Sequence, residues 1–481
     1  MPHGSTKGHR NMVPFDSDVL FAKLRRRYVF VGCFSLVGVS IISLFASTLW
    51  TLRPSTYALA DGGMETPQHL ENDATTVSVP AQAVQRFDSQ FYLRGPPTDR
   101  FRDNLRPEVK YISSWISAGW TNDVMTYINL IYLGILTDRV PVIGMFTPSH
   151  IGGHIPPIDF GEVFDVPRLR ELMQKPLVEW HEVKNRSSDV VEELGCWNVW
   201  EAVQDREHNP RASSVTGRLN LDISYTKLPT WIKLIPRYEH DPHASFSALA
   251  TFGFPETRAE YSVDPRESPQ KHVKLPPDEQ MLCYDYLYYT CAHQPYEYDY
   301  DYSPAWLFVG QYMHWTPWLE NLADSYVRKA LGTQDNESTP PWIGIHIRHG
   351  DFADWCGGVP VADCFAPISV IKRRVEDVKQ ELLERKGLVV NHVIMTSDER
   401  NATWWESVTA EGWYGIDHSN TVELYGAWYP VLIDAVIQSG GVGFVGTDRS
   451  TMSILARRRV QSWRDGVARI VKWGTPEADN H

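Results

Sequence analysis

The pattern of apolar positions in the last third of the chain predicts a layered α/β fold. Three short apolar runs, at 342–348, 388–395 and 442–446, are typical of strands in a parallel sheet that is covered on both faces. Each run is followed by a longer segment whose apolar positions have helical spacing. These helical segments are 367–386, 429–438 and 450–463. Strands and helices in this alternation predict a doubly wound α/β unit.

The residues before this unit alternate less regularly. The run from 124 to 136 predicts a buried helix, and the short run 140–144 predicts a strand after it. Between about 180 and 305 the pattern places no element. We therefore expect an N-terminal domain over 106–305, with insertions, and a C-terminal domain over 306–481.

One segment near the N-terminus, residues 28–52, contains no charged residue and exceeds the roughly 20 apolar residues that span a bilayer. Three arginines directly precede it, so we expect residues 1–27 to stay cytosolic and the rest of the chain to face the secretory lumen. The competing prediction, a cleaved signal peptide, has a shorter apolar region of about 7–15 residues. Residues 53–105 are rich in turn-forming residues and are predicted to be a flexible stem.

A signal anchor followed by a stem favours the Golgi membrane, with the endoplasmic reticulum as the alternative. Sequons for N-glycosylation agree with a luminal location. They begin at Asn185, Asn336 and Asn401.

The chain carries a net charge of -13, although residues 1–52 are net positive, so the body of the protein is strongly acidic. An acidic body does not attract polyanions through its overall field, which argues against nucleic acid as a partner. A local arginine can still bind a small anion.

Two pairs of cysteines share a separation of eight residues, Cys283/Cys291 and Cys356/Cys364. In an oxidising lumen each pair is predicted to close a small disulfide loop. Cys196 is then left without a partner. The alternative is that some of these cysteines are free, buried thiols.

Ligands of doubly wound sheets bind outside the carboxyl ends of the strands, so the loops after the strands hold the candidate site. The strand at 342–348 delivers Arg348 at its end, followed by Gly350 and Asp351. A guanidinium group binds phosphate through paired N–H donors, and Asp351 can fix its orientation. A purely structural Arg–Asp pair at a turn explains these residues equally well.

Two further features follow in the chain. The loop 446–453 enters a helix and is rich in hydroxyl groups, and the free N–H groups of a helix N-terminus bind anions. An ordinary N-cap at Ser450 or Thr451 explains the loop without a ligand. Asp434 lies on an apolar helix and needs a partner, either within the core or on a ligand such as the edge of a guanine base.

Together these features resemble the protein O-fucosyltransferase superfamily, a group of fucosyltransferases with the GT-B fold. The family pattern H-x-R-x-x-D is matched by His346, Arg348 and Asp351, and HIRHGDF is similar to the HLRRGDF of the type that modifies thrombospondin repeats. The sequence FVGTDRSTMS at 444–453 resembles that type's FIGT..STFS.

Two weaker matches extend the resemblance. Asp434 stands at the family's spacing of sixteen residues before Ser450. The residues from Gly119 to Asp123 resemble the family's GxFxN loop, which opens the N-terminal domain. The resemblance covers roughly 106–481 and is strongest over 342–460.

The resemblance implies a GT-B-like α/β fold, in which two Rossmann-like lobes face a cleft behind the anchor and stem. It also implies an enzyme that transfers fucose from GDP-fucose, with inversion, to a hydroxyl group. The acceptor would be Ser or Thr of a secretory protein, or a glycan. No metal ion or other cofactor is expected.

The roles of single residues follow from the same resemblance. Arg348 would bind the β-phosphate and stabilise it as it leaves, Asn122 would lie near the fucose, and Asp434 would bind the guanine edge. Arg348 and Asn122 are therefore the candidate catalytic residues. The candidate donor-binding residues are His346, Arg348, Asp351, Asp434, Ser450, Thr451 and Met452.

The chain also departs from the family pattern. Ala118 stands where the thrombospondin-repeat type has a glutamate proposed as the general base, and Met452 replaces a phenylalanine near the nucleobase. Donor binding is thus better matched than catalysis. A luminal protein that binds a GDP-sugar or a glycan without turnover remains an alternative.

Two short motifs in the sequence suggest other chemistry, a phosphatase reaction and metal binding. Arg348-His349-Gly350 is the start of a histidine phosphatase motif, but Phe352 stands where that motif has a second arginine. Asp299-Tyr300-Asp301 is a D-x-D pattern that can bind a metal ion in other sugar transferases. Its polar, aromatic surroundings favour an exposed loop that contacts the acceptor.

Overall fold

The computed structural model describes residues 86–334 and 336–480. The predicted cytosolic tail, the signal anchor and most of the predicted stem lie outside the described residues. Within the described part of the chain, no helix is both long and apolar enough to cross a membrane.

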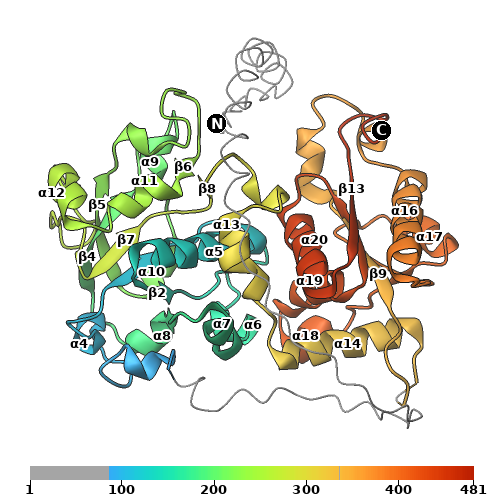
Figure 1. Cartoon of the computed structure of the whole chain (residues 1–481), viewed down its shortest axis with the longest axis horizontal. Coiled ribbons are helices and arrows are strands. Elements are labelled where there is room, and N and C mark those ends of the chain that lie inside the picture. Colours follow the sequence, from blue (N-terminus) through green and yellow to red (C-terminus); the bar gives the residue numbers. More distant parts are fainter. Residues whose placement is uncertain (1–85, 335, 481) are drawn as a thin grey trace, which may run out of the picture. The chain divides into compact units, whose positions relative to one another are not determined.

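The N-terminal sheet has six strands in the order β3-β2-β1-β7-β4-β5, and its neighbouring strands pair in parallel. The strands are β1 Tyr111–Ser114, β2 Val140–Ile143, β3 Val178–Glu179, β4 Glu192–Asn198, β5 Leu221–Lys227 and β7 Met281–Tyr284. The predicted helix at 124–136 is confirmed as part of α5, Trp120–Thr137, which connects β1 to β2 and packs on both (Figure 1). Because almost all of its side chains are buried, its apolar pattern extends around the whole helix.

The C-terminal sheet has five parallel strands in the order β11-β10-β9-β12-β13. They are β9 Trp342–Ile347, β10 His392–Ser397, β11 Tyr414–Gly415, β12 Gly443–Thr447 and β13 Val467–Val471. The helices predicted between them are present as α16 Ile368–Lys386, α19 Tyr429–Gly440 and α20 Thr451–Arg464. The α/β class with parallel sheets is therefore confirmed.

One strand begins later than predicted. The chain leaves α16 through Gly387, whose φ of 62° only glycine adopts easily, and residues 388–391 cross to the sheet before β10 starts at His392. Val389 is 64% exposed in this crossing. The apolar run at 388–395 therefore contains the connection 388–391 as well as the first part of β10.

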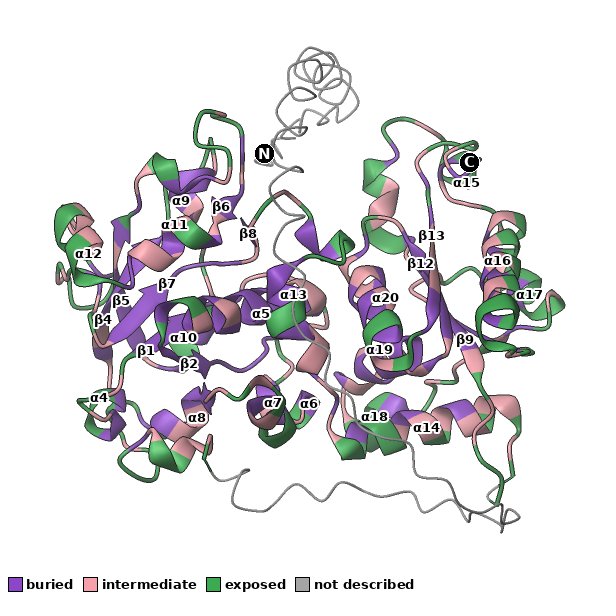
Figure 2. Ribbon diagram, in the orientation of Figure 1, coloured by how far each residue is buried: buried purple, intermediate pink, exposed green. Residues whose placement is uncertain are grey.

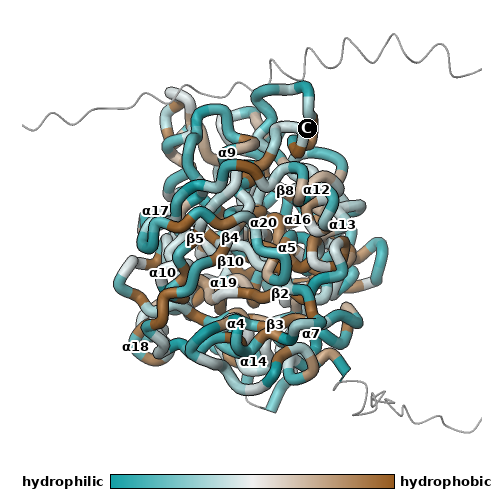
Figure 3. Tube along the Cα trace, turned by 90° about the vertical axis from the view of Figure 1, so that its left-hand side faces the viewer, coloured by the Kyte–Doolittle hydropathy of each residue, from teal (hydrophilic) through white to brown (hydrophobic). Residues whose placement is uncertain are grey.

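The remaining elements surround the two sheets, and the apolar positions concentrate on the inner strands and helix faces (Figures 2 and 3). In the first half of the chain the shorter helices are α4 Phe101–Asn104, α6 Phe160–Val163, α7 Val166–Met173, α8 Trp180–Val183, α9 Trp200–Val203, α10 Ser214–Arg218, α11 Phe246–Thr251 and α12 Pro255–Tyr261. Later helices are α13 Pro304–Phe308, α14 Pro317–Leu331, α15 Val361–Cys364, α17 Ala402–Ala410 and α18 Thr421–Tyr425. Strands β6 Ala244–Ser245 and β8 Thr290–Cys291 form a separate pair, and 3-10 turns cover Ser89–Phe91, Thr230–Ile232, Glu297–Asp299, Gly310–Tyr312 and Gly350–Trp355.

The described end of the predicted stem, residues 86–105, packs against the N-terminal sheet region. Leu93, Phe101 and Leu105 are buried, and the backbone N–H of Phe101 donates to Glu192 at 2.8 Å. The folded body thus starts before residue 106. Turn-forming residues are common in this segment, but its few large apolar side chains fix it to the body.

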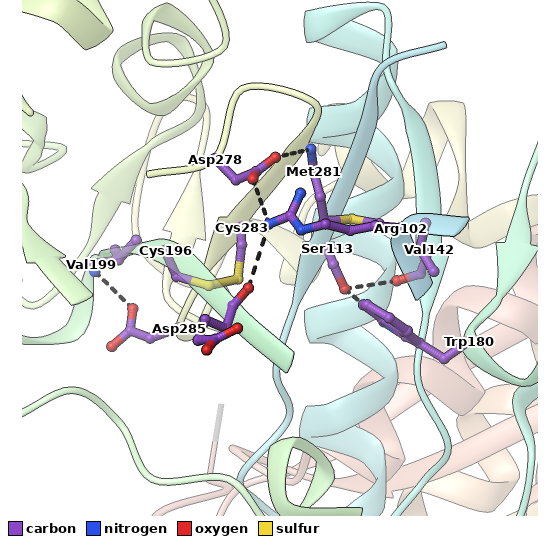
Figure 4. The surroundings of a disulfide bond; sticks show 11 residues. Arg102, Ser113, Val142, Trp180, Cys196, Val199, Asp278, Met281, Cys283 and Asp285 are labelled. Atoms are coloured by element: carbon purple, nitrogen blue, oxygen red, sulfur yellow. Dashed lines mark hydrogen bonds and ion pairs between the residues drawn. A yellow bond between two sulfur atoms is a disulfide. The ribbon is translucent and has the colours of Figure 1, made fainter. Parts of the chain in front are cut away.

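One of the two predicted disulfides is present and the other is wrong. Cys356 and Cys364 are bonded, whereas Cys283 bonds to Cys196 and Cys291 is a free, buried thiol. The reason is strand order: β4 and β7 are neighbours in register at Trp197 and Tyr284, so the preceding cysteines lie opposite each other (Figure 4). Equal spacing along the chain does not reveal this neighbourhood.

Candidate functional site

Arg348 follows the carboxyl end of β9, the central strand of the C-terminal sheet. Its backbone N–H donates to the Thr447 hydroxyl of the neighbouring strand β12 at 2.9 Å. Its guanidinium group contacts Asp351 through Nε at 3.0 Å and Nη2 at 2.7 Å, and contacts Asp398 through Nη1 at 2.8 Å. The side chain remains 32% exposed, and the second N–H of each Nη nitrogen has no acceptor among the described residues.

Asp398 comes directly after β10 and organises the turn that carries Arg348. One of its oxygens pairs with Arg348, and the other accepts the backbone N–H of His349 at 2.8 Å. Gly350 passes so close that a Cβ there would lie 2.3 Å from the Asp398 carboxylate. The position two residues after Arg348 therefore needs glycine, and the turn is built around a carboxylate that follows another strand.

A buried hydrogen-bond chain lies beneath this turn. Ser453 accepts the N–H of Thr447 at 2.9 Å, and its hydroxyl also hydrogen bonds to His346 Nδ1 at 2.8 Å. Thr447 in turn donates its hydroxyl to the His346 carbonyl at 3.0 Å. Burial, with the charge of Arg348 as a smaller cause, lowers the pKa of His346 to about 3. His346 is thus a neutral structural group that joins β9 to α20, rather than a group that faces a ligand.

The start of α20 lies at the same edge of the sheet. Ser450 is its N-cap and accepts the Ser453 N–H, while Thr451 is half-buried and hydrogen bonds to Thr121 of α5 at 2.7 Å between hydroxyl oxygens. Asn122 follows Thr121 and is also half-buried, and Met452 packs against the main core. The structure therefore brings together His346, Arg348, Asp351, Ser450 and Thr451. Asn122 is the residue after Thr121, which hydrogen bonds to Thr451.

Asp434 has a different environment. Its carboxylate pairs with His418 Nε2 at 2.9 Å, and the side chain is 21% exposed. His418 also contacts Thr421, and its ring packs at a tilt of 31° against Tyr326 of α14. Within the described part of the chain, Asp434 contacts neither Arg348 nor the start of α20, so its predicted partner, a base edge, would have to displace or join His418.

The loop before α5 is held by a buried acid. Asp123 accepts the backbone N–H groups of Ser117 at 3.2 Å and Ala118 at 3.0 Å, and its second oxygen is buried without a partner among the described residues. Burial raises the pKa of Asp123 to about 8. Position 118 holds alanine where the thrombospondin-repeat type has a glutamate, and the buried Asp123 does not provide an exposed carboxylate in its place.

His349, the possible phosphatase nucleophile, is engaged on both sides. Its Nδ1 lies 2.6 Å from Glu399, and its ring stacks on Phe365 at 4.3 Å between centroids. Only 7% of the residue is exposed. A histidine nucleophile needs an open ring nitrogen in front of a phosphoryl group, so this arrangement disfavours the phosphatase alternative.

Two acidic groups bear on metal binding. Asp159, Glu179 and His181 offer ligand atoms within 4.8 Å of one another, but Asp159 pairs with Arg186 and Glu179 accepts the Gly161 N–H. In the D-x-D pattern, Asp299 pairs with Arg457 at 2.9 Å and Asp301 pairs with Arg458. Both sets of carboxylates thus have protein partners, and neither adjoins Arg348.

Sequence reasoning missed Asp398 and Glu399, which hold the Arg348 turn. Thr447 and Ser453 lie in the predicted loop 446–453 but were given no role, although they bind the strand below the turn. The available signal was position: Asp398 and Glu399 directly follow a predicted strand, and the loops after strands are where ligands bind.

A scan against protein-family models finds no match, and neither does a search of curated proteins. Among solved structures, POFUT1 in complex with GDP-fucose is similar with a TM-score of 0.47 and 13% sequence identity, covering 77% of this chain and 99% of that chain. POFUT1 in complex with GDP has a TM-score of 0.46 at 13% identity, covering 75% and 98%. Fucosyltransferase NodZ from Bradyrhizobium has a TM-score of 0.34 at 12% identity, covering 73% and 93%.

Proposed function

We propose that this chain is a fucosyltransferase of GT-B type, which transfers fucose from GDP-fucose to a hydroxyl group of a secretory protein or of its glycans. The N-terminal anchor holds it in the Golgi membrane. The proposal rests on the site at the carboxyl ends of β9, β10 and β12.

The observation that carries the proposal is the proximity of Arg348 to the start of α20. The backbone of Arg348 is hydrogen bonded to Thr447, which ends the strand leading into that helix. A part-exposed guanidinium group and the N–H groups of a helix N-terminus form a site for a diphosphate. A nucleotide sugar offers such a diphosphate.

The net charge around Arg348 opposes the binding of a diphosphate unless one of the ion pairs of Arg348 is broken. Arg348 lies between Asp351 and Asp398, so the triad is net negative. Asp351 is 55% exposed and Asp398 is 26% exposed. A diphosphate therefore displaces Asp351, the more exposed partner, while Asp398 continues to hold the guanidinium group.

Arg348 then stabilises the charge that develops on the diphosphate as the bond to fucose breaks. This role needs no metal ion. The acceptor hydroxyl attacks the anomeric carbon from the opposite side, so the configuration inverts. Asn122 contacts the fucose, and the proton of the acceptor leaves through water or a diphosphate oxygen because Ala118 offers no base.

The test is a thermal-shift screen of the purified protein against nucleotide sugars. GDP and GDP-fucose should raise Tm by a few degrees, since a ligand at about 100 times its Kd stabilises by about 2.7 kcal/mol, while UDP-sugars should have no effect.

Arg348→Ala should lower fucose transfer by about a hundredfold or more. Asp434→Ala should weaken GDP more than UDP, because the carboxylate is proposed to bind guanine.

Arg400→Ala is the matched control, because Arg400 is exposed and lies on the adjacent loop after β10. It should leave both the thermal shift and transfer unchanged. Full transfer by Arg348→Ala, or equal stabilisation by GDP and UDP, would contradict the proposal.

A second candidate is a luminal protein that binds GDP-sugars without turnover. The observation that favours it is the lack of an exposed carboxylate at the Ala118 loop, together with the two carboxylates on Arg348. It predicts the same GDP-dependent thermal shift but no release of GDP from GDP-fucose with any acceptor.

A further inference from the structure

Residues 294–303, here called the tyrosine segment, form an exposed aromatic surface between β8 and α13. Tyr296 is 70% exposed, Tyr300 is 44% exposed and Tyr302 is 49% exposed. The rings of Tyr300 and Tyr302 stack with centroids 5.3 Å apart and planes 17° apart. Two parallel, half-exposed phenol rings offer a flat aromatic face and two hydroxyl groups to a ligand.

The tyrosine segment is attached to the helix whose N-terminus belongs to the candidate donor site. Arg457 of α20 donates to the carbonyl and carboxylate of Asp299, both at 2.9 Å, and Arg458 donates to the Tyr300 carbonyl at 2.8 Å and pairs with Asp301. The segment is thus positioned by the same helix that is proposed to hold the diphosphate.

A second observation gives the distance of the segment from the start of α20. Arg457, which donates to Asp299, comes six residues after Thr451, the first residue of that helix. At 1.5 Å per residue this separation is about 9 Å along the helix axis. The tyrosine segment is therefore attached within two turns of the proposed donor site.

The carboxylates of the segment all have partners within the protein. Glu297 accepts the backbone N–H groups of Ala292 and His293, both at 2.8 Å, and the two aspartates pair with arginines. What remains for a ligand is aromatic faces and phenol hydroxyls. This surface fits a neutral, hydroxyl-rich ligand better than a basic peptide, which would have to compete with Arg457 and Arg458 for the two aspartates, of which Asp301 is 92% exposed.

We propose that the tyrosine segment is the acceptor-binding surface and that the acceptor is a carbohydrate chain. Sugar rings have apolar faces that pack on aromatic rings, and their hydroxyl groups can hydrogen bond to the phenols. This inference rests on the proposed function, because it names the class of molecule that receives the fucose.

The test compares the intact protein with Tyr300→Ala/Tyr302→Ala and with the conservative Tyr300→Phe/Tyr302→Phe. Each is applied to an array of neutral oligosaccharides and to unglycosylated peptides that contain Ser and Thr. The alanine variant should lose about tenfold or more in glycan binding, because two stacking faces are removed, while the phenylalanine variant should stay within about threefold. Phe254→Ala, at another half-exposed aromatic residue on the surface, is the matched control and should bind as the unchanged protein does.

GDP binding, measured by calorimetry on the same variants, separates the two proposals. It should be equal in all of them, since no tyrosine of the segment contacts the diphosphate. If glycans do not bind, or bind the alanine variant equally well, the carbohydrate inference is wrong while the donor assignment stands. Tyrosine-dependent binding of the bare peptides would likewise overturn it in favour of a protein acceptor. If the unchanged protein does not bind GDP, the proposed function itself fails.

Discussion

At the scale of single residues, the Arg348 turn depends on a carboxylate from another strand. Asp398 uses one oxygen for the guanidinium group and the other for the His349 N–H. Asp351 is more exposed and makes no such backbone contact among the described residues. Asp398 is therefore the positioning residue, because it fixes both the side chain and the backbone that carries it.

Asp398→Asn tests this role. The amide oxygen can still accept the His349 N–H, so the fold should persist, but the amide group opposes Arg348 instead of attracting it. We expect the kcat of fucose transfer to fall by about 10- to 100-fold with KM for the donor changed much less. Asp354→Asn, at an exposed aspartate in the same turn, should leave both constants unchanged. A weaker donor KM with an unchanged kcat would contradict the positioning role.

Local sequence predicted the residues of the site that lie on one strand or one helix. Arg348 and Ser450 were selected because a strand end and a helix start are visible as patterns along the chain, whereas His346 was selected only through the family resemblance. Asp398 and Ser453 were assigned no role, because their contacts depend on the sheet order β10-β9-β12, which brings three distant segments together. Contact between such segments is decided by packing of the whole sheet, which no local pattern encodes.

At the scale of elements, the disulfide between Cys196 and Cys283 joins β4 to β7 in the middle of the N-terminal sheet. Both cysteines are fully buried, and 87 residues separate them along the chain. The Cys356–Cys364 bond closes a loop of only 8 residues in a small separate cluster. Closing the longer loop restricts the unfolded chain more strongly.

Removal of the two disulfides should therefore have unequal effects. Replacing Cys196 and Cys283 by alanine should lower the free energy of unfolding by about 2 kcal/mol more than replacing Cys356 and Cys364, from loop length alone. Urea unfolding, followed by tryptophan fluorescence, measures the difference. Cys291→Ala is the control for a buried cysteine without a bond. Equal losses for the two pairs would show that loop closure does not govern this stability.

At the scale of the whole described molecule, residues 86–334 and 336–480, one hydrophobic cluster runs from the N-terminal sheet to the helices of the C-terminal half. It contains Tyr127 of α5 together with Ile433 of α19 and Leu455 of α20, whereas the strands of the C-terminal sheet also pack with α16 in a second cluster. The predicted division at residue 305/306 falls inside α13, which packs on α5. A boundary drawn from the apolar pattern along the chain therefore cuts through a packed helix, and we expect the two sheets to unfold together.

Arg459 offers a test of this coupling. Its fully buried guanidinium group lies 4.2 Å from the Trp315 ring, 5.6 Å from Trp463 and 5.7 Å from Phe164, and burial lowers its pKa to about 9. Arg459→Ala should lower the free energy of unfolding by about 2–4 kcal/mol, because it opens a cavity between these rings. Arg459→Met fills that space without a buried charge and should stay within about 1 kcal/mol of the unchanged protein.

The readout is hydrogen exchange of peptides from β1 and from β9, one strand in each sheet. Because Phe164 lies in the connection between β2 and β3 and Trp463 belongs to α20, the cavity weakens contacts on both sides of the shared core. In Arg459→Ala both peptides should therefore lose protection by the same factor, as expected for one cooperative unit. Loss of protection confined to β9 would mean that the C-terminal sheet opens by itself, and the shared core would then not couple the two.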